Sequence, residues 1–256
     1  MDKYSILFAG NDLSAISGLE IENHDFNQLP ERDIRINKLA RRDKSIITSA
    51  DYVSKEIPVY FYACGGSRAG TEDVITQLKS LTQAQNALLV ISQGGDTVEY
   101  IATMNEMNIE WIGTSAQLVL NFLASDPVGK NSVAVDFIPT ATITSASGSY
   151  ASIVLGSATV YPTFSLTVTA VTGGTGASIT ILNALTSQGI TITRDWTAGE
   201  LVEINSEDMK ATVDGDVVDF TGMFPQFTSG TQQIQYLDTF TTRNITLSAV
   251  YNPRLL

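Results

Sequence analysis

The residue types that could support catalysis are sparse in this chain of 256 residues. His24 is the single histidine, so a Ser-His-Asp triad would have to be built on it. Ser67 lies in Gly65-Gly66-Ser67-Arg68-Ala69-Gly70, which resembles a nucleophile elbow. The G-x-S-x-G pattern fails there because Ala69 occupies the second glycine position. A glycine-rich loop leading into a helix is the simpler interpretation, so we predict no catalytic residues and no enzyme.

Patterns for metal, phosphate and cofactor binding are also weak. Asp214, Asp216 and Asp219 lack the terminal bidentate Glu of a calcium loop, and Asp214-Gly215 instead predicts a type I′ hairpin. A structural calcium ion there is the weaker alternative. The lone Cys64 excludes an internal disulfide and a cysteine-based zinc site, and we expect it in the core. Gly173-Gly174-Thr175-Gly176 lacks the lysine of a phosphate loop and predicts a hairpin turn. We expect no metal site and no cofactor.

One aromatic residue is a candidate for sugar binding. Trp196 follows Arg194 and Asp195, which are polar partners of the kind that accompany a stacked sugar ring. The alternative is that Trp196 fills a core or covers a sheet edge, as large aromatic side chains commonly do. Trp196 therefore stands as a candidate glycan contact beside this structural interpretation.

A basic cluster is the most distinctive charge feature. Alternation of Ile34 and Ile36 with charged residues predicts a two-stranded ribbon over about 31–46 that turns near 40–43. Because the chain has a net charge of −12, a basic arm could dock on an acidic neighbouring subunit. A solvated hairpin and a DNA contact are the alternatives. The cluster holds six of the fifteen basic residues, Arg32, Arg35, Lys38, Arg41, Arg42 and Lys44.

The elements that would carry these residues differ between the two halves. In residues 1–130, strand-like runs surround one amphipathic helix over about 72–85 that Thr71 could cap, which predicts an α+β domain. The segment from Asp126 to Asn131 combines Pro and Gly and is the predicted boundary. In residues 131–256, period-two alternation such as Ile179 and Ile181 recurs between turn signals and predicts a β-sandwich. The expected fold class is mainly β with one helix.

Composition and net charge limit the classes of partner that this chain could bind. Charged residues make up 16% of the chain, against roughly 25% in average soluble domains. Residues 137–193 contain no Asp, Glu, Lys or Arg, yet Thr, Ser and Gly interrupt their apolar residues too often for a membrane span. The N-terminus shows no readable signal peptide. The acidic balance argues against nucleic acid or membrane as the main partner.

The order of several short motifs resembles the distal tail protein family of long-tailed, non-contractile (siphovirus-type) bacteriophages. The similarity covers nearly the whole chain and is more specific in its second half. One departure is Ser229-Gly230-Thr231-Gln232, where the family often has Pro-Gly-x-Asn. The motifs are Phe8-Ala9-Gly10, Gly18-Leu19-Glu20-Ile21, Tyr60-Phe61-Tyr62, Trp196-Thr197-Ala198-Gly199-Glu200, Val213-Asp214-Gly215, Thr221-Gly222-Met223-Phe224-Pro225 and Tyr251-Asn252-Pro253-Arg254.

This resemblance implies a structural hub of a phage tail tip or baseplate. The N-terminal domain would be tube-protein-like and form a hexameric ring, and the C-terminal domain would be a galectin-like or carbohydrate-module-like sandwich. The implied partners are other copies of the chain, the tail tube protein, the tail-tip protein and receptor-binding proteins. DNA would pass through the lumen without specific binding, and no membrane insertion is expected. With this resemblance, the charge-free stretch 137–193 is expected to pack on neighbours or to be covered by Thr and Ser hydroxyls.

The ribbon 31–46 matches, in position, the arm with which family members embrace a neighbouring subunit. The implied location is the tail tip of the virion, after synthesis in the host cytoplasm. Two alternatives stay open, a carbohydrate-binding module for host surface polysaccharide and a tail-tube subunit.

Overall fold

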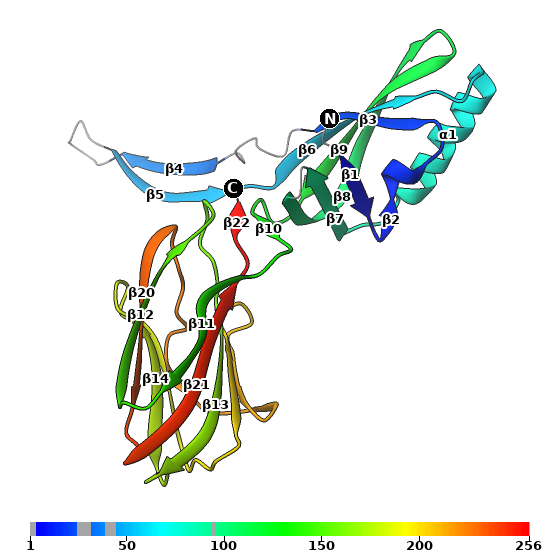
Figure 1. Ribbon diagram of the computed structural model, residues 1–256. Coiled ribbons are helices and arrows are strands. Elements are labelled where there is room, and N and C mark those ends of the chain that lie inside the picture. The colour runs from blue at the N-terminus through cyan, green and yellow to red at the C-terminus, as the bar shows by residue number, and fades with distance from the viewer. Residues whose placement is uncertain (1–3, 25–31, 39–44, 94–95, 256) are drawn as a thin grey trace. The chain divides into compact units, whose positions relative to one another are not determined.

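The computed structural model describes residues 4–24, 32–38, 45–93 and 96–255, and most of them lie in β-strands (Figure 1). The chain divides into two compact units, and the boundary between them lies between Ser132 and Val133. The described residues contain one α-helix, α1 (Arg68–Leu81), in the first unit. The predicted fold class, mainly β with one helix, is confirmed, whereas the galectin-like detail stays a prediction. No helix in the described part of the chain is long and apolar enough to cross a membrane.

The first unit is built on one antiparallel sheet with the strand order β2-β1-β7-β8-β9-β6-β3, and β10 pairs with β8. A separate two-stranded ribbon is formed by β4 and β5. The strands are β1 (Ser5–Phe8), β2 (Asn11–Asp12), β3 (Leu19–His24), β4 (Arg32–Lys38), β5 (Ser45–Tyr52), β6 (Lys55–Ala63), β7 (Ala87–Gln93), β8 (Asp96–Ile112), β9 (Ser115–Ala124) and β10 (Gly129–Asn131), with a short 3-10 helix at Leu13–Ala15.

The sheet of the first unit buries one of its faces. Along β6, buried and more exposed residues alternate, as expected for a strand that presents successive side chains to opposite faces. Val59 and Phe61 are fully buried and lie opposite Leu120 and Leu118 of β9, which are also buried. Tyr60, between them in sequence, is exposed. The apolar contacts across β6 and β9 therefore form part of the core of this unit.

Helix α1 begins four residues before the predicted start and ends at Leu81 instead of residue 85. The Ser67 hydroxyl accepts a hydrogen bond from the Gly70 amide at 3.1 Å and so takes the capping role predicted for Thr71. Thr71 lies inside the helix and is buried. At the other end, the Thr82 amide and hydroxyl both donate to the Leu78 carbonyl, which closes the last turn.

The second unit is a sandwich of two antiparallel sheets. Six strands follow the order β11-β21-β13-β16-β17-β18, and five follow the order β12-β20-β14-β15-β19. The strands are β11 (Val135–Ile143), β12 (Ser147–Val154), β13 (Thr163–Thr172), β14 (Ala177–Asn183), β15 (Gln188–Arg194), β16 (Leu201–Asn205), β17 (Lys210–Val213), β18 (Asp216–Val217), β19 (Thr221–Gly222), β20 (Gly230–Asp238) and β21 (Thr242–Tyr251), and the short β22 (Arg254–Leu255) follows them.

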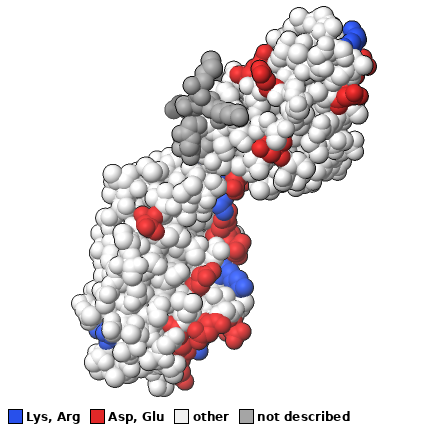
Figure 2. Space-filling view, turned by 45° about the vertical axis from the view of Figure 1, so that its right-hand side comes forward, with Lys and Arg blue, Asp and Glu red and all other residues white. Residues whose placement is uncertain are grey.

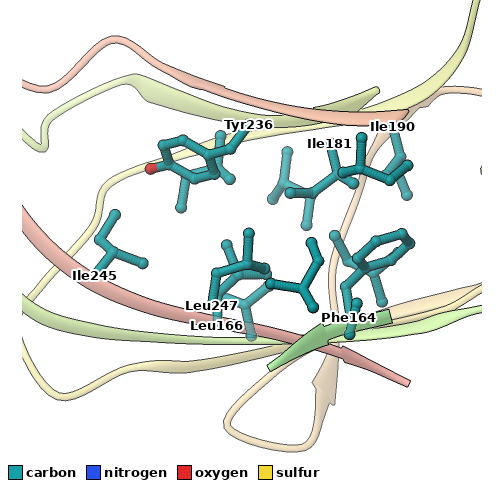
Figure 3. Close-up of a cluster of buried hydrophobic side chains, with 14 of the residues drawn as sticks. Phe164, Leu166, Ile181, Ile190, Tyr236, Ile245 and Leu247 are labelled. Carbon is teal, nitrogen blue, oxygen red and sulfur yellow. The ribbon is translucent and has the colours of Figure 1, made fainter. Parts of the chain in front are cut away.

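The inner faces of these two sheets form a single hydrophobic core. Figure 3 shows Phe164, Leu166 and Leu247 from one sheet facing Ile181 and Ile190 from the other. All five side chains are fully buried, and each belongs to a run that alternates with Thr, Ser or Gly. Period-two patterning places the apolar half of each strand in the core, so the predicted sandwich follows directly from the sequence pattern.

Two predicted turns have different outcomes. The segment Gly173–Gly176 connects β13 of one sheet to β14 of the other, so it is a crossover and the predicted hairpin turn there is wrong. Strand-forming residues on both sides of a glycine run do not reveal which strands pair. At Asp214-Gly215, both residues have positive φ, at 52° and 89°, between the antiparallel strands β17 and β18. This geometry is that of the predicted type I′ hairpin.

The charge-free stretch from residue 137 to residue 193 spans β11 to β15. Its outward positions carry hydroxyl residues, such as the exposed Thr167 and the half-buried Thr180 and Thr191. The hydroxyls of Thr180 and Thr191 lie 2.8 Å apart across neighbouring strands. Thr and Ser hydroxyls therefore cover part of this surface, which is one of the two outcomes predicted from the sequence.

Candidate functional site

The predicted basic arm is a hairpin of β4 and β5. Its backbone register runs from Arg32 opposite Tyr52 to Lys38 opposite Ser45, with one irregularity after Arg35. The hairpin is longer than the predicted ribbon because β5 continues to Tyr52. Arg41 and the neighbouring Arg42 and Lys44 lie outside the described residues. The role of all six basic residues in contacts between subunits stays a prediction.

The glycine-rich loop before α1 is occupied by structural contacts. The Thr71 hydroxyl donates to the Thr114 carbonyl at 2.7 Å and accepts from the Gly65 amide at 2.9 Å. A Cβ atom on Gly65 would lie 2.1 Å from the carbonyl carbon of Gly70, so only glycine fits there. The Ser67 hydroxyl accepts a hydrogen bond from the Gly70 amide. The serine and glycines of the pattern that resembles a nucleophile elbow therefore have structural roles at the start of α1.

Cys64 is exposed, and the expectation that it belongs to the core is wrong. It directly follows β6, whose last residue, Ala63, is buried, so strand alternation turns the next side chain outward. Hydrogen bonds from Ser115 and from the Gly66 backbone lower the pKa of the thiol below its usual range. A single exposed thiol with these contacts does not by itself indicate a function.

Trp196 belongs to the core of the sandwich. Its side chain is 5% exposed, and its indole N–H donates to the Ala177 carbonyl at 2.9 Å. Its ring packs edge-on against Phe240, with the centroids 6.3 Å apart. The polar neighbour Arg194 forms a 3.0 Å ion pair with Glu200. Stacking a sugar ring requires an exposed aromatic face. The burial of Trp196 therefore supports the alternative that it fills the core, and it leaves no open face for a glycan.

The acidic residues after β17 take part in a turn. The Asp214 carboxylate accepts from the Leu201 amide at 2.9 Å, and the Asp214 amide donates to the Leu201 carbonyl at 2.8 Å. Within residues 4–24, 32–38, 45–93 and 96–255, no three His, Cys, Asp or Glu side chains gather as metal ligands would. The Asp214 carboxylate therefore ties the β17–β18 turn to the start of β16.

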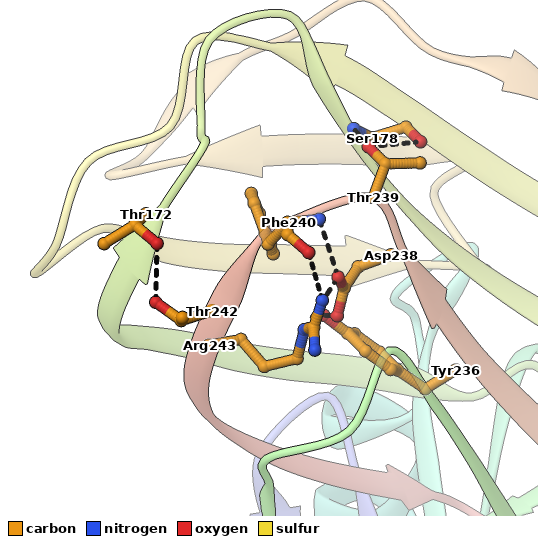
Figure 4. A network of polar contacts seen from close by, with 8 residues as sticks. All are labelled: Thr172, Ser178, Tyr236, Asp238, Thr239, Phe240, Thr242 and Arg243. Carbon is orange, nitrogen blue, oxygen red and sulfur yellow. Dashed lines mark hydrogen bonds and ion pairs between the residues drawn. The ribbon is translucent and has the colours of Figure 1, made fainter.

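A buried polar network closes one end of the sandwich, at the turn between β20 and β21 (Figure 4). The Asp238 carboxylate accepts from the Tyr236 hydroxyl at 2.8 Å, from the Phe240 amide at 2.9 Å and from the Arg243 Nε at 2.9 Å. The Asp238 side chain is fully buried and that of Arg243 is 10% exposed. Burial, and then the hydrogen bond to Asp238, raises the pKa of Tyr236 far above its usual range. This network therefore fixes the turn between β20 and β21.

The surface of the described residues contains two shallow hollows that a ligand or partner could occupy. One, of about 380 Å³, lies over β3, β6, β8 and β9 and is lined in part by Glu22, Tyr60 and Glu110. The other, of about 330 Å³, is lined in part by Arg194 and Asp219. The described lining residues include the carboxylates of Glu22, Glu110 and Asp219 but no His, Cys or Ser side chain.

Charge is unevenly distributed on the surface. In Figure 2, acidic side chains gather along one side of the second unit, and most of the face in view is uncharged. The exposed acidic residues of this unit include Asp195, Glu203, Glu207, Asp208, Asp214, Asp216 and Asp219, which lie on β16 to β18 and the connecting loops. Surface contacts at this side would therefore select a basic or neutral partner.

Comparison with known proteins gives a family match in the second unit and similarity to solved structures of phage tail proteins. Residues 155–254 match the family model described as siphovirus-type tail component, C-terminal domain. The crystal structure of the Dit protein of phage SPP1 is similar, with 15% identity, 99% of each chain covered and a TM-score of 0.71. That protein is described as a paradigm of the hub adsorption apparatus in phages that infect Gram-positive bacteria.

A chain of the phage P2 baseplate in its activated conformation has 8% identity, covers 97% of this chain and 98% of its own, and has a TM-score of 0.42. No curated protein sequence matches. The family match covers most of the second unit, and the SPP1 Dit fold spans both units. The resemblance to distal tail proteins is therefore confirmed: residues 155–254 match the C-terminal domain of siphovirus-type tail components, and the fold of the chain is similar to that of SPP1 Dit.

Proposed function

We propose that this chain is a non-enzymatic structural hub of a siphovirus-type tail tip. The observation that carries the proposal is that a tail-component C-terminal domain, residues 155–254, occurs in a chain whose whole fold is similar to that of SPP1 Dit. The family match in the second unit favours this role over a simple tail-tube subunit. A carbohydrate-binding role is less well supported, because the Trp196 side chain is buried.

In this proposal the first unit forms a hexameric ring at the virion tail tip. The ring joins the tail tube protein to the tail-tip protein, supports receptor-binding proteins and lets DNA pass without specific binding. Two features support a ring contact. The β4–β5 hairpin pairs only with itself among the described strands, and its sequence segment holds six of the fifteen basic residues of an acidic chain. A basic arm on an acidic neighbour gives favourable electrostatics at each repeat of the ring.

Electron microscopy of the purified full chain, combined with its mass in solution, tests the ring. We expect sixfold rings, with the arm variant Arg41→Glu/Arg42→Glu shifting the population to single chains at low ionic strength. The matched control Lys79→Glu/Lys210→Glu makes the same change in net charge at two exposed positions outside the arm. Rings that survive arm reversal would refute the arm contact. A chain that forms no rings and is missing from the purified virions of a phage that encodes it would refute the hub.

A further inference from the structure

The sandwich of the second unit has four edge strands, and three of them carry features that hinder pairing with another chain. The edge strand β11 is interrupted by two register irregularities between Asp136 and Ala141, and it contains Pro139. The edge strands β18 and β19 are only two residues long, and β18 begins with the charged Asp216. Bulges, proline, charge and shortness are the features by which natural sheets avoid association through their edges.

The fourth edge strand, β12, has none of these features. It is eight residues long and pairs only with β20, in an unbroken register from Ser147 opposite Leu237 to Val154 opposite Gly230. Its sequence contains no proline and no charged residue, since it lies within the charge-free stretch 137–193. The side of β12 away from β20 therefore offers a regular row of backbone N–H and C=O groups to a further strand.

The exposed side chains of β12 indicate which kind of strand could pair with its free edge. Ser147, Ser149 and Ala151 are small and exposed. Ile153 is 66% exposed, and Leu155, just after the strand, is 54% exposed. A complementary strand would place small or polar residues beside the first part of β12 and apolar residues beside Ile153, because directly opposed side chains on one face of a sheet contact each other.

We infer that β12 is a docking edge, on which an extended, uncharged segment of another tail protein adds a sixth strand to the five-stranded sheet. This inference rests on the proposed hub function, which requires attachment sites for other tail proteins. Strand addition takes its affinity from backbone hydrogen bonds and its specificity from alternate side chains. The exposed acidic residues of β16 to β18 belong to the other, six-stranded sheet, so none of them lies on the sheet that β12 borders.

A second copy of the same strand fits this edge less well. Antiparallel pairing of two β12 strands centred on Ala151 would use most of the strand, but it would place each exposed Ile153 opposite Ser149. Centring the pair on Ile153 would match apolar residues, but it would use only the last three residues of each strand. Such a contact is also twofold, whereas a ring is built from head-to-tail contacts. A strand from a different protein can pair along the whole of β12 and also place an apolar residue beside Ile153, so it fits this edge better.

Site-specific photo-crosslinking in assembled virions tests this inference. A photoreactive amino acid is placed at Ala151, and at the exposed Thr140 of the protected edge β11 as the matched control. We expect position 151, and not position 140, to crosslink to one extended segment of another tail protein, identified by mass spectrometry. In parallel, Ala151→Lys should remove that protein from virions that still contain the chain, while Thr140→Lys should not.

The outcomes separate this inference from the hub itself. Crosslinks from position 151 to another copy of the chain, or no excess over position 140, would overturn the docking edge while the chain remains a virion component. Retention of the crosslinked protein in Ala151→Lys virions would also overturn it. Absence of the unmodified chain from virions would refute the hub proposal before any crosslink is measured.

Discussion

Replacing Asp238 is expected to destabilise the second unit strongly. Its carboxylate accepts three hydrogen bonds, from the Tyr236 hydroxyl, the Phe240 amide and the Arg243 guanidinium. In Asp238→Ala the guanidinium, 10% exposed, loses its counterion. Removing one partner of a buried ion pair costs about 3–5 kcal/mol, because the other charge stays desolvated. We therefore expect the free energy of unfolding of this unit to fall by about 4 kcal/mol.

Urea denaturation in a Trp111→Phe background measures this loss. The chain has two tryptophans, so Trp196, in the core of the second unit, becomes the only indole reporter. At fixed ionic strength, the midpoint should fall while the slope with urea stays unchanged. The conservative Asp238→Asn keeps one acceptor oxygen and should lose less than Asp238→Ala.

A double-mutant cycle isolates the pair itself. Arg243→Met alone leaves the Asp238 carboxylate buried with two of its three donors, and combining it with Asp238→Asn removes both charges. The double variant should lose less than the sum of the two single variants by at least about 1 kcal/mol, since coupled partners are not additive. Additive losses, or a loss below about 1 kcal/mol for Asp238→Ala, would refute the assignment of this network as a stabilising closure of the sandwich.

Three further predictions concern the core, a buried tyrosine and one glycine. Phe227 is fully buried, with its ring centroid 4.5 Å from that of Phe137, so Phe227→Ala should cost about 3–5 kcal/mol in urea denaturation. Burial raises the pKa of Tyr100 to about 12, against about 10 when exposed. The neutral, buried Tyr100 stabilises the folded state fully below pH 10, and this contribution is lost as the pH rises toward 12, by about 1.4 kcal/mol per pH unit. The free energy of unfolding of Tyr100→Phe should therefore fall less steeply at alkaline pH. An identical pH profile for the variant and the unmodified chain would contradict this. A Cβ on Gly65 would lie 2.1 Å from Gly70, so Gly65→Ala should cost roughly 1–3 kcal/mol and reduce helical circular dichroism; full stability would show that the loop can shift.

Local patterns predicted the elements well where one face of each element is buried. Alternation along residues such as Ile179 and Ile181 predicts strands, because the side-chain period of a strand is two and burial selects one of its faces. The Asp214-Gly215 turn follows from the same local logic, since a type I′ turn needs two residues that tolerate positive φ. These features depend on residues close together in the sequence.

The candidate site was predicted less completely, because exposure depends on contacts between distant residues. Cys64 lies just past the end of a buried strand, which its residue type does not reveal. Trp196 has polar neighbours in sequence, but Phe240 and Ala177, from other strands, enclose it. No local signal predicted the Asp238 and Arg243 pair, although the two residues are five positions apart on either side of a turn. The arm at Arg41 and Arg42 stays a prediction.

The sequence by itself determined that this protein is a two-part, mainly β chain with one helix and a charge-free segment. Its motif order also determined the resemblance to distal tail proteins. Only the tertiary structure decided which strands are neighbours, that Gly173–Gly176 crosses between sheets and that β12, among the four edges of the sandwich, is the long, regular and neutral one. The physical reason is that periodicity records which face of a strand is buried, whereas strand order and edges are set by hydrogen bonds between segments far apart in the chain.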